Sequence, residues 1–364
     1  MSITATSMDE NVHAASSSRG EAGTAVKLWL YTVAALIAVL VLVGGATRLT
    51  DSGLSITEWA PFSGILPPLS HEQWVSEFAR YQQTDEFKLQ NYAMTLAQFE
   101  VIYWWEWGHR FLGRLIGLSV LIPMVWFWLR GTMPAGYGRS TFILFLLICF
   151  QGAIGWWMVQ SGLSQRVDVS QLRLAIHLTM ACIIFVYTVW LARGLGTHTQ
   201  DGLPIQAWQG FAVIVLVLSQ TFLGGLVAGL DAGMAYNTWP TMNGEWMPAA
   251  VWAITPWWQN LFDNAVMVQF VHRTSAYLVV LGIALHAWHL WANAPDSLHA
   301  RRGLVLVGLV FVQMMIGIVT LVMQVPFFWA LVHQFGAIVI LAFAAAHWRA
   351  LSMNRTPLVV ARSA

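Results

Sequence analysis

The sequence predicts an all-α integral membrane protein, with eight transmembrane helices arranged as two tandem, parallel-oriented four-helix bundles. Three observations predict this fold. First, 57% of the residues are hydrophobic and only 10% are charged, whereas soluble domains carry about 25% charged residues. Second, eight apolar stretches approach the roughly 20 residues that a helix needs to cross a bilayer. Third, the second half of the chain repeats the motifs of the first. The net charge of +1 and the lack of a basic run indicate no nucleic-acid partner.

The apolar windows give the positions of the spans. The eight predicted spans cover residues 28–47, 109–129, 141–160, 173–192, 207–229, 269–290, 303–323 and 328–348. One set of short loops and ends collects Lys27, Arg130, Arg139, Arg193, Arg301, Arg302, Arg349 and Arg355. Because basic residues favour the inner side, we expect a multi-pass protein of the cell inner membrane with both termini in the cytoplasm.

These spans divide the chain into predicted segments. They are a disordered cytoplasmic tail over 1–26, an N-terminal bundle over 27–195 with an outer loop at 48–108, a C-terminal bundle over 206–350, and a cytoplasmic tail over 351–364. The two cysteines, Cys149 and Cys182, both fall inside apolar spans. They are typical of small buried thiols rather than of an extramembrane disulfide.

The two halves are related by an internal repeat. The stretch "VLVGGATRLTDSGLSITEWAPFSG" (41–64) matches "TFLGGLVAGLDAGMAYNTWPTMNG" (221–244), and "GHRFLGRLIGL" (108–118) matches "VHRTSAYLVVL" (271–281). In the same way, "FQGAIGWWMVQSGL" (150–163) matches "VQMMIGIVTLVMQV" (312–325), and "RLAIHLTMA" (173–181) matches "WALVHQFGA" (329–337). Each copy contains four spans, an even number, so the copies share one orientation about an axis along the membrane normal. Each copy is expected to form a bundle with its site between facing helices.

Four histidines are paired by this repeat: His109, His177, His272 and His333. Each lies near the start of an even-numbered span, so all four should lie at a similar depth near the outer boundary, where polar groups are costly unless they have a partner. A zinc ion would require three or four converging protein ligands. Two imidazoles per bundle instead indicate axial ligation of a haem iron. By contrast, we interpret His286, His289 and His347, near inner helix ends, as structural.

Arginines near the outer boundary are candidates for the anionic propionates of such a haem, through charge-assisted pairs. These candidates are Arg110, Arg114, Arg173 and Arg273. Anchoring to lipid headgroups is the alternative interpretation, and the sequence leaves both open.

One difference between the copies points to chemistry. Glu106 stands three residues before His109, whereas Gln269 stands three residues before His272. Residues i and i+3 share a helix face, so an ionisable group should lie beside only one haem. This difference favours a catalytic role for Glu106 as an acid/base group or a stabilising charge. The alternative is a carboxylate that stabilises a helix amino terminus.

The motifs "GGATRLTDSGLSITEW", "EWGHRFLGRLIG", "QGAIGWWMVQSGL", "RLAIHL", "FVHRTSAYL" and "LVHQFGA" together resemble the haem A synthase family. The outer-loop stretch "ARYQQTDEFKLQN" is similar to the alphaproteobacterial and mitochondrial branch. The resemblance implies an oxidoreductase that converts haem O to haem A by oxidising the C8 methyl group to a formyl group through haem I. It also implies that His109 and His177 bind the substrate haem O, that His272 and His333 bind a haem b cofactor, and that Glu106 is the functional glutamate.

The same resemblance implies partners: a haem O synthase as donor and the cytochrome oxidase assembly machinery as acceptor, with membrane lipid around the spans. Association into a homo-oligomer stays open. Other family members carry a cysteine pair in an outer loop, which this chain lacks. The alternative function is a di-haem cytochrome b-type electron-transfer subunit, which would need the same four histidines. A transporter on parallel repeats is less favoured, because the spans carry hardly any charge at mid-depth.

Overall fold

The computed structural model describes residues 4–59, 63–163, 166–196 and 207–353. Its long helices are α1 (Thr4–Leu49), α4 (Leu96–Leu129), α5 (Tyr137–Gly162), α6 (Gln171–Gly194), α7 (Ala207–Gly229), α9 (Ala265–Asn293), α10 (Leu298–Val322) and α11 (Phe327–Met353). Its short helices are η1 (Ser63–Ile65), α2 (His71–Tyr81), α3 (Asp85–Leu89), η2 (Ala232–Met234), η3 (Ala249–Trp252), η4 (Trp257–Gln259) and α8 (Asn260–Asp263).

Within these described residues, eight helices are long and apolar enough to cross a membrane. They correspond one to one with the eight predicted spans, and the all-helical membrane fold class is confirmed. The first membrane-spanning segment covers Gly23–Leu49 of α1. The sequence predicts a disordered tail over 1–26, but in the structure α1 already begins at Thr4. No proline interrupts residues 4–26, so nothing in this stretch removes a helical hydrogen bond.

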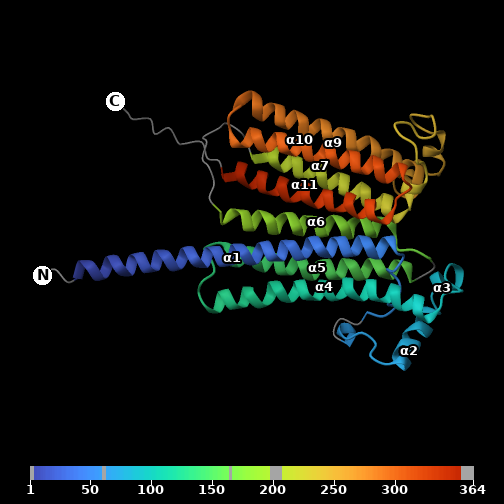
Figure 1. Ribbon diagram of the computed structural model, residues 1–364, viewed down its shortest axis with the longest axis horizontal. Helices are drawn as coiled ribbons and strands as arrows, with labels where there is room; N and C mark the ends of the chain where they lie inside the picture. Colours follow the sequence, from blue (N-terminus) through green and yellow to red (C-terminus); the bar gives the residue numbers. More distant parts are fainter. Residues whose placement is uncertain (1–3, 60–62, 164–165, 197–206, 354–364) are drawn as a thin grey trace.

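The long helices lie side by side in one slab (Figure 1). In the first half, α1 and α5 each contact both α4 and α6. In the second half, α7 and α10 each contact both α9 and α11. The halves meet through α1, α6, α7 and α11. Helices α2 and α3 lie at one end of the slab, which also carries the loop between α7 and α9 (Figure 1). We call this the loop end.

Small residues allow the helices of the two halves to approach closely. A Cβ added to Gly225 on α7 would lie 2.7 Å from the Cα of Ala175 on α6. Small residues at such contacts bring helix backbones together in membranes, where the hydrophobic effect does not drive helices together. Buried apolar side chains from both halves then form one continuous core, which includes Val33, Ile184, Val213 and Leu341.

Helix α4 begins much earlier than the sequence predicts. Its predicted span starts at residue 109, but the helix starts at Leu96, inside the segment expected to be an outer loop. Thr95 and Gln98 form a capping box, in which each side chain accepts from the backbone N–H of the other, at 3.4 and 2.9 Å.

An aromatic cluster stabilises this additional part of α4. Phe99 is fully buried and stacks on Tyr81 of α2, with ring centroids 5.3 Å apart. Phe78 of α2 lies 5.1 Å from the same ring. The extension is amphipathic and packs on α2, which explains why a search for purely apolar windows misses it.

A single arginine links the two halves at the loop end. Arg48, at the end of α1, donates to Asp51 at 2.6 Å and to Asp231 at 2.7 Å. The two aspartates occupy equivalent positions in the repeat, and both have a left-handed backbone, with φ of 46° and 47°. Aspartate tolerates that conformation better than most residues. Arg48 therefore connects the turns that follow the first helix of each half.

Replacing Arg48 by Ala should destabilise the protein by about 1–2 kcal/mol, because two charge-assisted hydrogen bonds are lost. The aspartate side chains are 68% exposed, so solvent screening keeps the loss at the low end of such contacts. Thermal unfolding of purified protein in detergent measures the effect. Removing the charge of the exposed Arg139 is the matched control. Equal shifts in the two variants would contradict a specific contribution of Arg48.

Candidate functional site

The four repeat-matched histidines lie in two pairs, one in each half. His109 on α4 and His177 on α6 are close enough to interact electrostatically, and so are His272 on α9 and His333 on α11. All four side chains are half-buried. Each pair therefore joins two helices of the same half.

Each imidazole packs edge-on against a glycine of a neighbouring helix. A Cβ at Gly44, Gly155, Gly224 or Gly317 would lie 2.8, 2.9, 3.3 or 2.8 Å from the Cε1 atom of His109, His177, His272 or His333, respectively. A methyl group would collide with the ring at Gly44, Gly155 and Gly317 and would be tight at Gly224, so the glycines allow each imidazole to lie against the helix backbone. The sequence analysis did not single out this pairing, although all four glycines fall within the repeated motifs.

Three of the four rings also contact a glutamine side chain. Gln151, Gln220 and Gln313 place their Nε2 atoms 3.1, 3.1 and 3.2 Å from the Nδ1 atoms of His177, His272 and His333. The same three Nε2 atoms donate to the backbone carbonyls of those histidines, at 2.9, 3.0 and 2.7 Å. Each glutamine thus fixes both the ring and the backbone of its histidine. The match of Gln151 with Gln313 in the repeat was the available signal for this role.

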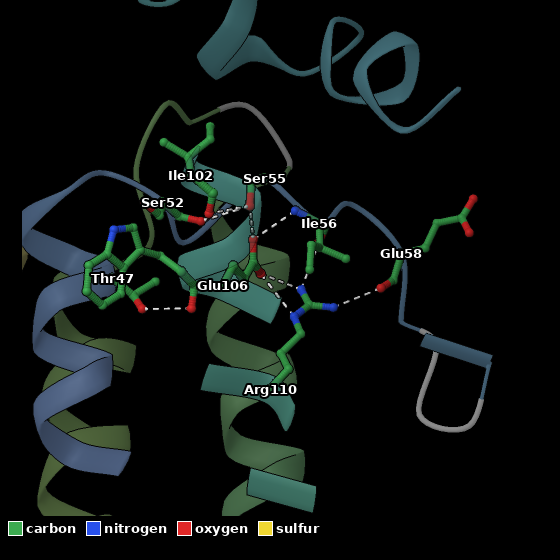
Figure 2. Close-up of polar contacts among 9 residues, drawn as sticks. Thr47, Ser52, Ser55, Ile56, Glu58, Ile102, Glu106 and Arg110 are labelled. Atoms are coloured by element: carbon green, nitrogen blue, oxygen red, sulfur yellow. Dashed lines mark hydrogen bonds and ion pairs between the residues drawn. The ribbon is translucent and has the colours of Figure 1, made fainter. Parts of the chain in front are cut away.

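Glu106 is the centre of a buried polar network in the first half (Figure 2). Its side chain is almost inaccessible, and Oε2 accepts from the Ser55 hydroxyl and the Ile56 backbone N–H, both at 2.8 Å. Oε1 accepts from Nε and Nη2 of Arg110, at 3.0 and 2.6 Å. A carboxylate has about four acceptor positions, and all of them are used here. Because α4 begins at Leu96, Glu106 lies well inside the helix, so stabilisation of a helix amino terminus is excluded as its role.

Arg110 connects this carboxylate to the loop after α1. Besides its pair with Glu106, it donates to the carbonyls of Ile56 at 2.8 Å and Glu58 at 3.0 Å (Figure 2). Its guanidinium is thus engaged with protein groups on every nitrogen.

The second half has an arginine and a glutamine at the equivalent positions, with different contacts. Arg273, the counterpart of Arg110, donates to the carbonyls of Thr238, Pro240 and Thr241, at 2.9, 3.1 and 3.3 Å. Gln269, the counterpart of Glu106, donates its amide to the carbonyl of Tyr236 at 3.0 Å. The carboxylate in the first half accepts a backbone N–H at this place, whereas the amide in the second half donates to a backbone carbonyl.

The other predicted arginines have different surroundings. Arg173 on α6 donates to the carbonyl of Trp157 at 2.7 Å, and its guanidinium lies over that indole ring, 4.6 Å from the centroid. Arg114 is half-buried one helical turn beyond Arg110 on α4. Nη1 of Arg273 is a buried donor with no hydrogen-bond partner among the described residues.

A second buried carboxyl lies near Glu106 at the loop end. Glu86 on α3 is 4% exposed, and its Oε2 has no hydrogen-bond partner in the described part of the chain. Burial, and next the charge of Glu106, raise the pKa of Glu86 to about 8, while a contact with the Tyr81 hydroxyl opposes the rise. Asp168 and Asp51 add smaller repulsions. Glu86 is therefore expected to be protonated at neutral pH.

This shift predicts a pH-dependent stability. The pKa of Glu86 rises from 4.5 to about 8 on folding, so the folded state binds more protons in that range, and stability should fall as pH rises through it. Glu86→Gln should remove this loss and unfold at a higher temperature than wild type at pH 9, with a smaller difference at pH 5. Tryptophan-detected thermal unfolding checks this, with the exposed Glu245→Gln as control. Identical pH responses of Glu86→Gln and wild type would show that Glu86 ionises freely.

The histidines at the opposite end form a separate contact. Nε2 of His286 on α9 lies 3.0 Å from Nε2 of His347 on α11, and the ring of His299 on α10 lies 6.2 Å from that of His347, centroid to centroid. Two of these side chains, His347 and His299, are fully buried. His286 and His347 thus contact each other between α9 and α11.

The fold and the paired histidines define a multi-pass membrane protein with a duplicated imidazole-pair site. Residues 27–345 match the family COX15-CtaA, described as "Cytochrome oxidase assembly protein". The chain is similar to proteins named Heme A synthase from Brucella ovis and Brucella suis biovar 1, each 53% identical over 89% of this chain and 91% of the relative. The corresponding protein of Brucella anthropi is 50% identical over the same shares. The chain belongs to the haem A synthase family.

Proposed function

We propose that the protein oxidises haem O to haem A at the histidine pair of its N-terminal half and holds a haem b cofactor at the pair of its C-terminal half. It is an oxidoreductase of haem A biosynthesis, at 53% identity to proteins named Heme A synthase. This membership removes the support for the alternative, a di-haem electron-transfer subunit. The observation that carries the assignment of the sites is the arrangement of four imidazoles in two matched pairs.

The donor set of each pair fits a haem iron. Among the described residues, no group of three or more His, Cys, Asp or Glu side chains could hold a metal ion by itself. Two imidazoles suffice only where a planar macrocycle provides the other four ligands. A glycine faces each ring, and in three of the four environments a glutamine donates to the carbonyl of the histidine and holds the backbone that carries the ring. His109 and His177 would hold the substrate, and His272 and His333 the cofactor.

The buried carboxylate gives the first half its chemical difference. Oxidation of a ring methyl builds positive charge at that carbon, and a fixed negative charge nearby would stabilise it. All four acceptor positions of Glu106 are occupied in the structure. A role as proton acceptor would require Arg110 to leave, so the geometry favours the fixed charge. Through Arg110, Glu106 also positions the loop around Ile56 and Glu58.

The C-terminal half lacks a carboxylate at this position. Haem b bound there would supply one-electron transfer to or from the first half. Arg273, with its free buried Nη1 donor, is the candidate for a propionate. By the chemistry of its substrate and product, the protein receives haem O from a haem O synthase and passes haem A to the cytochrome oxidase assembly machinery. We place both termini on the cytoplasmic side, because the basic residues gather in the loops at that end.

Changing each histidine in turn to Ala should separate the two sites. His109→Ala or His177→Ala should remove haem O, haem I and haem A from the purified protein and leave haem b. His272→Ala or His333→Ala should deplete haem b. Extraction and chromatography of the pigments measure both. His289→Ala, at the other end of α9 from His272, is the control and should change neither pigment.

Glu106→Gln should leave the haem content unchanged and reduce formation of haem A by about 10²–10³-fold, the usual loss when a preorganised charge is removed. The reason is visible in the second half, where Gln269 donates to a carbonyl instead of accepting an N–H. Product formation in membranes supplied with haem O measures the rate. The reciprocal variant, Gln269→Glu, should not gain activity. A normal rate for Glu106→Gln would exclude the role proposed for Glu106.

A further inference from the structure

Basic side chains from three helices gather where α6 ends. Helix α6 ends at Gly194, at the end of the slab opposite the loop end, and it contacts both α1 and α11 (Figure 1). A Cβ at Gly194 would lie 2.6 Å from Nη2 of Arg349 on α11. A Cβ at Gly196 would lie 3.1 Å from Nη1 of Arg193 and 3.6 Å from Nζ of Lys27 on α1. We call Lys27, Arg193 and Arg349 the basic cluster.

The charges at this end differ from those at the loop end. At the loop end, Arg48 pairs with the carboxylates of Asp51 and Asp231. Neither Lys27 nor Arg349 forms an ion pair with any residue in the part of the chain that the structure describes. The carboxyl end of α6 carries only about half a negative charge. The basic cluster would therefore attract an additional anion.

The surroundings of the cluster are typical of the level of lipid headgroups. The guanidinium of Arg349 lies over the ring of Trp190, 3.8 Å from the centroid. Trp348 lies 5.8 Å from Trp190 and 5.3 Å from Phe211, centroid to centroid. Aromatic rings are enriched where the membrane meets water, and basic pockets between membrane-spanning helices bind anionic headgroups. The three basic side chains are half-buried, so the packing of the helices restricts their positions.

We propose that the basic cluster binds the phosphate group of an anionic phospholipid at the junction of the two halves. Lys27 and Arg193 belong to the N-terminal half and Arg349 to the C-terminal half, so one headgroup contacts both. Arg48 links the halves at the loop end through two carboxylates of the protein. At the opposite end the protein supplies the cations and the lipid supplies the anion. This inference does not depend on the reaction that the protein catalyses.

Titration of the full-length protein with phosphatidylglycerol tests the site. The protein is stripped of lipid in a neutral detergent, and native mass spectrometry measures the dissociation constant of the first bound lipid. Lys27→Gln and Arg349→Gln should each weaken binding about fivefold, the usual contribution of one basic residue to anionic-lipid attraction. Arg301→Gln is the matched control, since Arg301 is an exposed basic residue at the same end, on α10. It should bind like wild type.

Further measurements identify what the cluster recognises. Lys27→Arg keeps the positive charge and should retain the affinity for phosphatidylglycerol. Phosphatidylcholine has the same phosphate but no net charge, and it should bind more weakly than phosphatidylglycerol. Inorganic phosphate, added at the same concentration as the lipid, should not displace it, because free phosphate gains nothing from the apolar surface beside the cluster.

The outcomes decide the inference without reference to haem content. Weaker binding in the two Gln variants, with normal binding in Arg301→Gln, supports it. Equal binding by Lys27→Gln and Arg301→Gln overturns it, and this comparison holds even if Arg349→Gln, which also loses its contact with Trp190, does not fold. Equal affinity for the two lipids, or displacement of phosphatidylglycerol by inorganic phosphate, overturns it as well.

Discussion

The structure depends on satisfying both nitrogens of imidazoles that are placed among apolar helices. A polar group at this depth has no bulk water as a hydrogen-bond partner, so a ring nitrogen without a partner costs free energy. In three of the four histidine environments, a glutamine donates to the carbonyl of the histidine and lies close to Nδ1. A glycine opposite each ring then allows the helices to approach closely enough for the contact.

The two halves hold equivalent loops with equivalent arginines but place different buried groups beside them. Arg110 and Arg273 each donate to carbonyls of the loop that follows the first helix of its half, and they reach equivalent residues, Glu58 and Thr238. The buried groups beside these arginines differ in their contacts: Glu106 accepts four hydrogen bonds, whereas Gln269 donates one to the carbonyl of Tyr236. A duplicated scaffold can therefore carry a charged site and a neutral site with the same helices.

Much of this organisation could be predicted from the sequence, because it follows from local composition and from the repeat. The eight spans and the four histidines are visible as apolar windows and matched motifs. The early start of α4 is not, since its first turns are amphipathic and gain stability only by packing Phe99 on α2. The partners of Glu106 were also out of reach, because Ser55 and Ile56 approach it only in the folded chain. The contacts of Arg110 with the Ile56 and Glu58 carbonyls were out of reach for the same reason.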